Sequence, residues 1–320
     1  MGKHSMTADA ETLRAGLKKR KNGFVAELKR HWGIYLIMLP GILYYLIFKY
    51  GSMAGVIIAF EDYTPARGML GSQWVGFEHF KEFFSDIYFF RVLKNTITLS
   101  LYDLLVGFPA PIILALLLNE IKNERFKKLV QTVTYLPHFI SMVVICGLVI
   151  TFCYKDGLIN DILAMFGLER KSLLMEPQYY KTIHVFSGVW QQVGWGSIVY
   201  LAALTNVDME LYEAATLDGA GRWKQTLHVT LPGILPTIVT LLLLRIGSLM
   251  SVGYEKVILL YNPGIYETAD IISSYVYRNG LTRANYSYSA AIDLLNSIIN
   301  LVLLIGANFV SKRVNDVGLW

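Results

Sequence analysis

Long apolar runs separated by polar segments are the main pattern of this chain. A transmembrane helix needs roughly twenty mainly apolar residues, and six runs approach that length. They predict helices over Gly33–Phe60, Leu93–Leu118, Leu129–Tyr154, Lys181–Leu204, Leu231–Gly253 and Ala290–Val310. Lys49 interrupts the first run, so two ends of the first span are considered, one near Lys49 and one at Phe60. The pattern predicts an all-α polytopic membrane protein with six transmembrane helices and both termini on one side.

The composition favours the same class. Hydrophobic residues make up 54% of the 320 residues and charged residues 17%, whereas a soluble domain of this size would carry more charge. Much of the net charge of +5 lies near the N-terminus, where anionic lipid is the expected partner. No nucleic acid is needed to explain it.

The basic residues orient the spans. They gather before the first span, between the second and third, and after the last, which are segments on one face of a six-span chain. These residues are Arg14, Lys18, Lys19, Arg20, Lys21, Lys29, Arg30, Lys122, Arg125, Lys127, Lys128, Lys312 and Arg313. Because basic segments next to membrane helices stay on the cytoplasmic side, we expect both termini to be cytoplasmic.

The sequence divides into a basic N-terminal segment, residues 1–30, and one membrane domain, residues 31–320. The first segment is too long and too polar for a cleaved signal peptide. Two interpretations of it stay open: a disordered tail, or a weakly amphipathic helix on the membrane surface. The apolar face of such a helix would hold Leu13, Leu17, Phe24 and Leu28.

Little in the sequence suggests catalysis. Cys146 and Cys153 lie in one predicted helix at positions roughly 10 Å apart along its axis, too far for a disulfide. The sequence has no GxxxxGKS/T phosphate loop, no GxSxG nucleophile motif and no metal-ligand spacing. We therefore expect no enzymatic activity and no cofactor in this chain.

One polar segment, from about Thr205 to Thr230, is too long for a simple link between two spans. Glu213–Ala215 favours helix, and Asp218-Gly219 is a turn signal, since glycine adopts left-handed backbone angles at little cost. Leu231-Pro232 then opens the next apolar run. The segment predicts a helix, a turn and a second helix on the membrane surface, which is the shape of a docking element.

This segment resembles the EAA loop of ABC importer permeases. Glu-Ala-Ala is followed by Gly219 and then by an aliphatic residue ahead of Leu-Pro, and the one departure is Val229 where isoleucine is preferred. The resemblance implies a type I ABC importer permease of the bacterial cytoplasmic membrane, whose loop, about 205–230, is a coupling helix seated in a cleft of an ATPase. The coupling residues would be Glu213, Ala214, Ala215, Asp218, Gly219 and Ala220.

Further motifs resemble one branch of the carbohydrate permeases, which takes up oligosaccharides or fragments of polysaccharides. They include Trp74–Phe77, Tyr135–Ser141, Asp218–Arg222, Tyr275–Arg278 and the terminal Leu319-Trp320. The resemblance implies a second, homologous permease subunit, two ATPase subunits that hold ATP and Mg, and an extracytoplasmic solute-binding protein. The expected substrate is an oligosaccharide, in a narrower interpretation an acidic one of the alginate type. The alternatives are a permease for another small solute, or an ATP-independent channel or secondary transporter.

Two ionisable residues are predicted inside the spans, where charge is costly and points to function. Asp103 in the second span and Arg245 in the fifth lie at matching depths. Three interpretations stay open: the two pair with each other, Arg245 meets a sugar carboxylate that matches its forked donors, or Arg245 has another structural role. Asp293 is another candidate partner.

The fourth span is rich in glycine and aromatic residues. Flat rings suit the apolar faces of sugar rings and glutamines can bond hydroxyls, but the same residues can also pack the core. The substrate-path candidates here are Trp190, Gln191, Trp195 and Tyr200.

Two long segments are expected on the outer side. In the first, Phe77, Phe80 and Phe84 suit one helical face and predict a surface helix lying on the bundle. The second, residues 254–289, is rich in tyrosine, and three interpretations stay open: it meets the binding protein, it shields the mouth of the cavity, or it has plain surface roles. Its contact candidates are Tyr275, Tyr277, Arg278 and Arg283.

Overall fold

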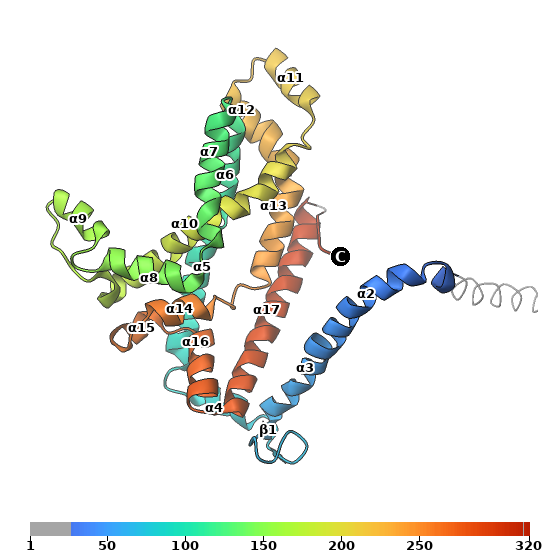
Figure 1. Ribbon diagram of the computed structural model, residues 1–320, viewed down its shortest axis with the longest axis vertical. Helices are drawn as coiled ribbons and strands as arrows, with labels where there is room; N and C mark the ends of the chain where they lie inside the picture. Colours follow the sequence, from blue (N-terminus) through green and yellow to red (C-terminus); the bar gives the residue numbers. More distant parts are fainter. Residues whose placement is uncertain (1–26, 316) are drawn as a thin grey trace, which may run out of the picture. The chain divides into compact units, whose positions relative to one another are not determined.

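A computed structural model describes residues 27–315 and 317–320, and it is mostly helical, as predicted (Figure 1). The chain divides into two compact units, residues 1–57 and 58–320. The one sheet in the described part is an antiparallel pair of two-residue strands, β1 (Glu61–Asp62) and β2 (Gln73–Trp74).

The first unit is a helical run that continues to the start of the second. It consists of α2 (Trp32–Tyr44), the π-helical η1 (Tyr45–Tyr50), α3 (Gly51–Met53) and the 3₁₀-helical η2 (Ala54–Phe60). Lys49 lies within η1, so the helix does not end there. The described residues up to Ile57 are exposed or half-buried. Of the predicted N-terminal amphipathic face, Leu13, Leu17 and Phe24 lie outside the described residues.

Helices α5, α6, α10, α13 and α17 form the body of the second unit. Their bounds are Phe89–Gly107, Pro109–Glu120, Pro177–Leu204, Leu231–Ile246 and Tyr286–Asn315. Helix α5 continues into α6, because Phe108 keeps helical angles (φ −74°, ψ −44°) and proline is tolerated in a first helical turn.

Five helical stretches in the described residues are long and apolar enough to cross a membrane: Trp32–Phe60, Phe89–Glu120, Met142–Met165, Arg222–Ile246 and Tyr286–Val314. The fourth predicted span, α10, is not among them, because it carries buried polar side chains such as His184 and Gln191. It nevertheless has 28 residues, about 42 Å at 1.5 Å per residue.

The predicted third span, Leu129–Tyr154, is wrong as a single helix. Helix α7 (Glu124–Tyr135) is followed by a 3₁₀ turn, η3 (Leu136–Phe139), and a new helix, α8 (Met142–Cys153), leads away from it (Figure 1). Pro137 lacks the N–H that a continuing helix needs, and the Ser141 hydroxyl accepts a hydrogen bond from the Val144 N–H and starts α8. Helix α9 (Leu158–Met165) and the turn η4 (Leu173–Met175) complete this region.

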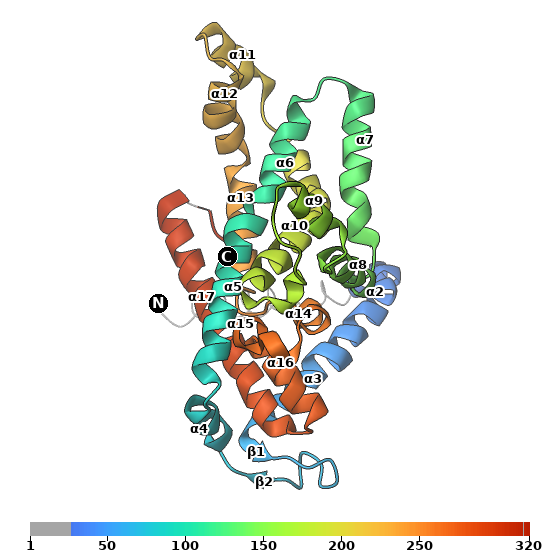
Figure 2. The ribbon, with the colours of Figure 1, turned by 90° about the vertical axis from the view of Figure 1, so that its left-hand side faces the viewer.

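The connecting segments lie at opposite ends of the second unit. One end holds α11 (Met209–Leu217), α12 (Arg222–Gln225) and the link between α6 and α7, and the other holds α4 (Glu78–Ser85) and the strands (Figures 1 and 2). The π-helical η5 (Thr226–Thr230) joins α12 to α13. Between α13 and α17 come α14 (Tyr254–Leu260), η6 (Pro263–Ile265), α15 (Tyr266–Ala269), α16 (Ile272–Tyr277) and the π-helical η7 (Arg278–Thr282).

The predicted surface helix exists as α4, but its buried face was mispredicted. Phe83 is only 2% exposed and packs with Tyr275, Tyr288 and Ile292, whereas Phe77 and Phe84 are exposed. The predicted face included Phe77, which precedes the first helical residue, Glu78, whereas the helix turns Phe83 toward α16 and α17.

Helix α10 is the centre of the unit and packs against α5, α6, α7, α13 and α14. Its closest approach to α7 is at Gly194, where an added Cβ would lie 2.8 Å from the backbone nitrogen of Tyr135 and nearer still to the Thr134 backbone. Small residues allow helices to approach closely in membranes. Gly194 therefore allows α10 to lie close to α7 and fixes the position of the side chains that α10 carries.

Candidate functional site

The predicted coupling loop is a closed helical hairpin. The Asp208 carboxylate accepts the Glu210 N–H at 2.9 Å and caps α11. The Tyr212 hydroxyl lies 3.0 Å from the Thr230 hydroxyl, and the Gln225 amide donates to the Thr216 hydroxyl at 2.9 Å. These bonds hold α11 against α12 and against Thr230, the last residue before α13.

The C-terminus of α11 is closed by a left-handed glycine. Gly219 has φ +75°, and its N–H bonds the Thr216 carbonyl at 3.0 Å, while the Ala220 N–H bonds the Ala215 carbonyl at 2.9 Å. This pair of bonds is the Schellman motif. The turn expected at Asp218-Gly219 is therefore present.

The surface of this hairpin is apolar where it is most exposed. Leu217 is 89% and Trp223 73% exposed, and Met209 and Leu211 are also more than half exposed. Glu213, Ala214 and Asp218 are exposed beside them. Exposed apolar side chains gathered on one protruding element mark an interaction site.

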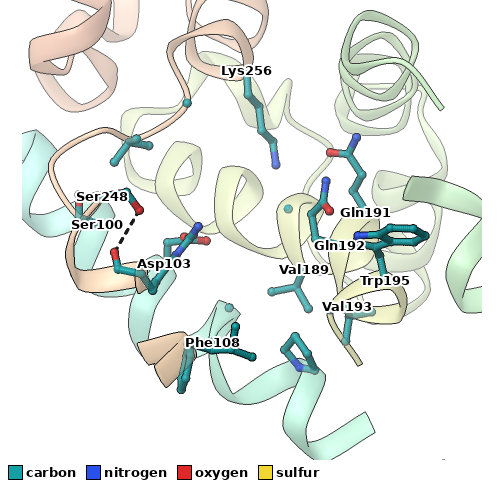
Figure 3. A pocket seen from close by; sticks show the side chains of 18 of the residues that line it. Ser100, Asp103, Phe108, Val189, Gln191, Gln192, Val193, Trp195, Ser248 and Lys256 are labelled. Carbon is teal, nitrogen blue, oxygen red and sulfur yellow. Dashed lines mark hydrogen bonds and ion pairs between the residues drawn. The ribbon is translucent and has the colours of Figure 1, made fainter. Parts of the chain in front are cut away.

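A cavity of about 660 Å³ opens between α5, α6, α10, α13 and α14 (Figure 3). Its lining includes five of the six predicted substrate-path residues, namely Asp103, Gln191, Trp195, Tyr200 and Arg245. Trp190, the sixth, is not part of this lining. In the part of the chain that the structure describes, no group of three or more His, Cys, Asp or Glu side chains is placed to hold a metal ion.

Arg245 and Asp103 form an ion pair that joins α13 to α5. Asp293 is not paired with Arg245 in the described residues. The Arg245 side chain is about half exposed, but its charge is neutralised by the Asp103 carboxylate. The pair accounts for both intramembrane charges that the sequence singled out.

Trp195 is held by an aromatic stack on the cavity wall. Its ring stacks on His138 with centroids 4.3 Å apart and planes 2° from parallel, and His138 Nδ1 lies 2.9 Å from Gln192 Oε1. His138 comes from η3, so the break between α7 and α8 is what brings the imidazole to α10. Trp195 is 45% exposed, which leaves ring surface available to a ligand.

Lys256 is a cavity residue that was not predicted from the sequence. It lies in α14, outside the five apolar stretches, is 6% exposed, and donates a hydrogen bond to the His184 carbonyl at 2.7 Å. Burial lowers the pKa of this amine to about 8, so it stays mostly protonated at pH 7. A lysine directly before the apolar run Val257–Leu260 was the available signal.

The predicted outer contacts divide into two groups. Tyr275 is 4% exposed, and its hydroxyl donates to Asp86, which also accepts from the Tyr288 hydroxyl at 2.9 Å. Arg278 binds the fully buried Asp270 with both terminal nitrogens, at 2.6 and 3.1 Å. Tyr275 and Arg278 are therefore occupied within the chain. Tyr277 and Arg283 remain exposed.

Asp86 lies before α5 and is held in its charged form. Burial raises the pKa of its carboxyl group, but hydrogen bonds from the two tyrosine hydroxyls and the Tyr88 N–H, with the positive charge of Arg91, outweigh burial and lower the pKa below its usual value. Through these hydrogen bonds the Asp86 carboxylate connects α16 and α17 to the segment that precedes α5.

Comparison with known proteins identifies the type of subunit. The family model described as "Binding-protein-dependent transport system inner membrane component" matches residues 107–316. Protein LplB of Bacillus subtilis (strain 168) is 45% identical over 313 residues, covering 98% of each chain. The polygalacturonan/rhamnogalacturonan transport system permease protein YteP of the same organism is 42% identical over 304 residues, covering 95% of each.

A solved structure agrees over nearly the whole chain. It is the crystal structure of a bacterial ABC transporter involved in the import of the acidic polysaccharide alginate, and one of its chains is 44% identical, with a TM-score of 0.84, over 91% of this chain and 99% of that one. A second crystal structure, of an alginate ABC transporter in complex with an alginate pentasaccharide-bound periplasmic protein, gives the same TM-score.

The helical body, the protruding hairpin and these likenesses define a type I ABC importer permease subunit, a multi-pass membrane protein. The chain belongs to the family of inner membrane components of binding-protein-dependent transport systems.

Proposed function

We propose that this chain is one of two paired permease subunits that import acidic oligosaccharides through the cavity at α10. The observation that carries the proposal is the 44% identical chain of the alginate importer, which matches 91% of this chain. YteP, whose name includes polygalacturonan, a polymer of uronic acid units, supports the same substrate class. In the cavity, Trp195 offers a flat ring to a sugar, and Gln191 and Gln192 offer amides to its hydroxyls. The charged side chains that line the cavity carry a net positive charge.

Two partner ATPase subunits bind ATP and Mg, hydrolyse the ATP and contact α11. The exposed Leu217 and Trp223 support a protein partner there, and Glu213 is exposed beside them. The basic link between α6 and α7 lies at the same end as α11 (Figure 2), which supports a cytoplasmic position for this end. The basic residues near both ends of the sequence support the same side for the termini. A solute-binding protein would approach the opposite end, where Tyr277 and Arg283 are candidate contacts. The apolar residues of α2, exposed within this chain, suit lipid or the second permease subunit.

Uptake in proteoliposomes tests the function. The complex of this chain with its partner permease, ATPase and binding protein should take up uronic acid oligosaccharides only with ATP, and these sugars should stimulate hydrolysis more than neutral ones of equal length. Transport by this chain without ATP would refute an importer of this class. Equal stimulation by neutral sugars would refute the acidic substrate.

A further inference from the structure

We propose that Lys256 binds a sugar carboxylate in the cavity, and that this lysine, not Arg245, gives the cavity its preference for acidic substrates. The inference rests on the proposed function and names the residue that recognises the charge. It starts from the charged side chains among the residues that line the cavity, which are Asp103, Arg245 and Lys256.

Two of these charges cancel. Arg245 is paired with Asp103, so a carboxylate arriving at the guanidinium would have to compete with a carboxylate already bound. Among the described residues, Lys256 has no carboxylate within ion-pair distance. The cavity therefore carries one net positive charge, and that charge lies on the lysine.

The amine of Lys256 has bonding capacity left. An ammonium group has three donors, and the hydrogen bond to the His184 carbonyl uses one of them. Figure 3 shows the side chain reaching into the space between Asp103 on one side and Gln191 and Gln192 on the other. The two free donors therefore lie among groups that suit the hydroxyls of the same sugar.

The backbone of α10 leaves room beside the amine. Gly188 lines the cavity, and a Cβ added there would lie 3.2 Å from Lys256 Nζ. With glycine at this position, one side of the ammonium group stays open to the cavity. A buried cation without an ionic partner is destabilising, and a bound carboxylate would offset that cost.

The competing explanation is purely structural: Lys256 ties α14 to α10 through the His184 carbonyl. The two explanations differ in whether a positive charge is needed at position 256. A structural tie needs a donor, which glutamine also supplies, whereas recognition of a carboxylate needs a positive charge, which only arginine preserves.

The test measures binding to the complete transporter in lipid nanodiscs by equilibrium dialysis. The probes are a uronic acid trisaccharide and the same trisaccharide with its carboxyl groups reduced to alcohols. The variants are Lys256→Met, Lys256→Gln and Lys256→Arg, with Lys155→Met, at an exposed turn, as the matched control.

The Met and Gln variants should bind the acidic trisaccharide about ten- to a hundredfold more weakly, the range for losing a hydrogen bond to a charged group. Their affinity for the reduced trisaccharide should not change. The Arg variant and Lys155→Met should keep the preference for the acid.

Several results would overturn the inference. They are an unchanged preference for the acid in Lys256→Met, an equal loss of both trisaccharides, equal binding of both by the wild type, or failure of all three variants to assemble. Stimulation of wild-type ATPase activity by the acidic trisaccharide with the binding protein is measured in parallel. If the acidic trisaccharide does not stimulate the wild-type ATPase, the proposed function is refuted. If it does stimulate the ATPase but the Lys256 variants bind the acidic trisaccharide as the wild type does, only the role of Lys256 is refuted.

Discussion

Replacing Gly219 with alanine or valine should uncouple ATP hydrolysis from sugar uptake while leaving sugar binding intact. The residue stands just after α11 with φ +75°, and its N–H closes the last turn of that helix on the Thr216 carbonyl. Nothing lies within 4 Å of an added Cβ, so the cost comes from backbone conformation and not from a clash.

The left-handed conformation costs a residue with a side chain about 1–2 kcal/mol. That energy lowers the ratio of closed to open hairpins about 5- to 30-fold. Valine, which is β-branched, should be worse than alanine, and asparagine should be milder, because its side chain tolerates this region. Sugar transported per ATP hydrolysed should fall in the order glycine, asparagine, alanine, valine.

Gly221 provides a matched control two residues away. It has φ −70° and, like Gly219, open space around an added Cβ. Gly221→Ala should therefore couple like the wild type, and all variants should bind oligosaccharide equally in nanodiscs. Two results would show that the left-handed turn is not needed for coupling to the proposed ATPase. One is a Gly219→Val transporter that moves as much sugar per ATP as the wild type, and the other is an equal loss of sugar per ATP in Gly221→Ala.

Other substitutions test the body of the protein. Gly194→Ala should lower the thermal stability of the purified complex by about 1–3 kcal/mol through overpacking, while Gly147→Ala, where space is open, should not; equal melting temperatures would contradict the close helix contact. Arg245→Met should reduce assembly by leaving Asp103 unpaired, and adding Asp103→Asn should restore it; no recovery in the double variant would argue against the ion pair as a structural element. Because the folded-state pKa of Asp86 is lowered, its stabilising contribution is present above the unfolded pKa of about 3.9 and is lost as the pH falls through the lower folded value. Melting temperatures between pH 7 and pH 3 should therefore fall less in Asp86→Asn than in the wild type, and identical profiles would contradict this.

The sequence was informative where function depends on local chemistry. The helical hairpin between α10 and α13 was predicted with its turn at Gly219, because helix propensity and the left-handed conformation of glycine depend on neighbouring residues. The apolar runs likewise predicted most of the membrane helices, since their length is compared with a fixed bilayer thickness. Prediction failed between Leu129 and Tyr154, because one span was drawn across two helices. Helix α7 is rich in polar residues and ends before Pro137, whereas the strongly apolar run begins only with α8.

What the sequence determined by itself was a polytopic helical membrane protein, most of its apolar spans and the local structure of the hairpin, which follow from composition and short-range spacing. The class of importer came from the resemblance of its motifs to a known family. Only the tertiary structure decided which charges meet: it joined Asp103 to Arg245, stacked His138 on Trp195, and left Lys256 without an ionic partner. The residues in each of these contacts lie far apart in the chain, and their distances depend on how α5, α10, α13 and α14 pack. Charge recognition depends on such distances, so the residue that carries it emerged only from the folded chain.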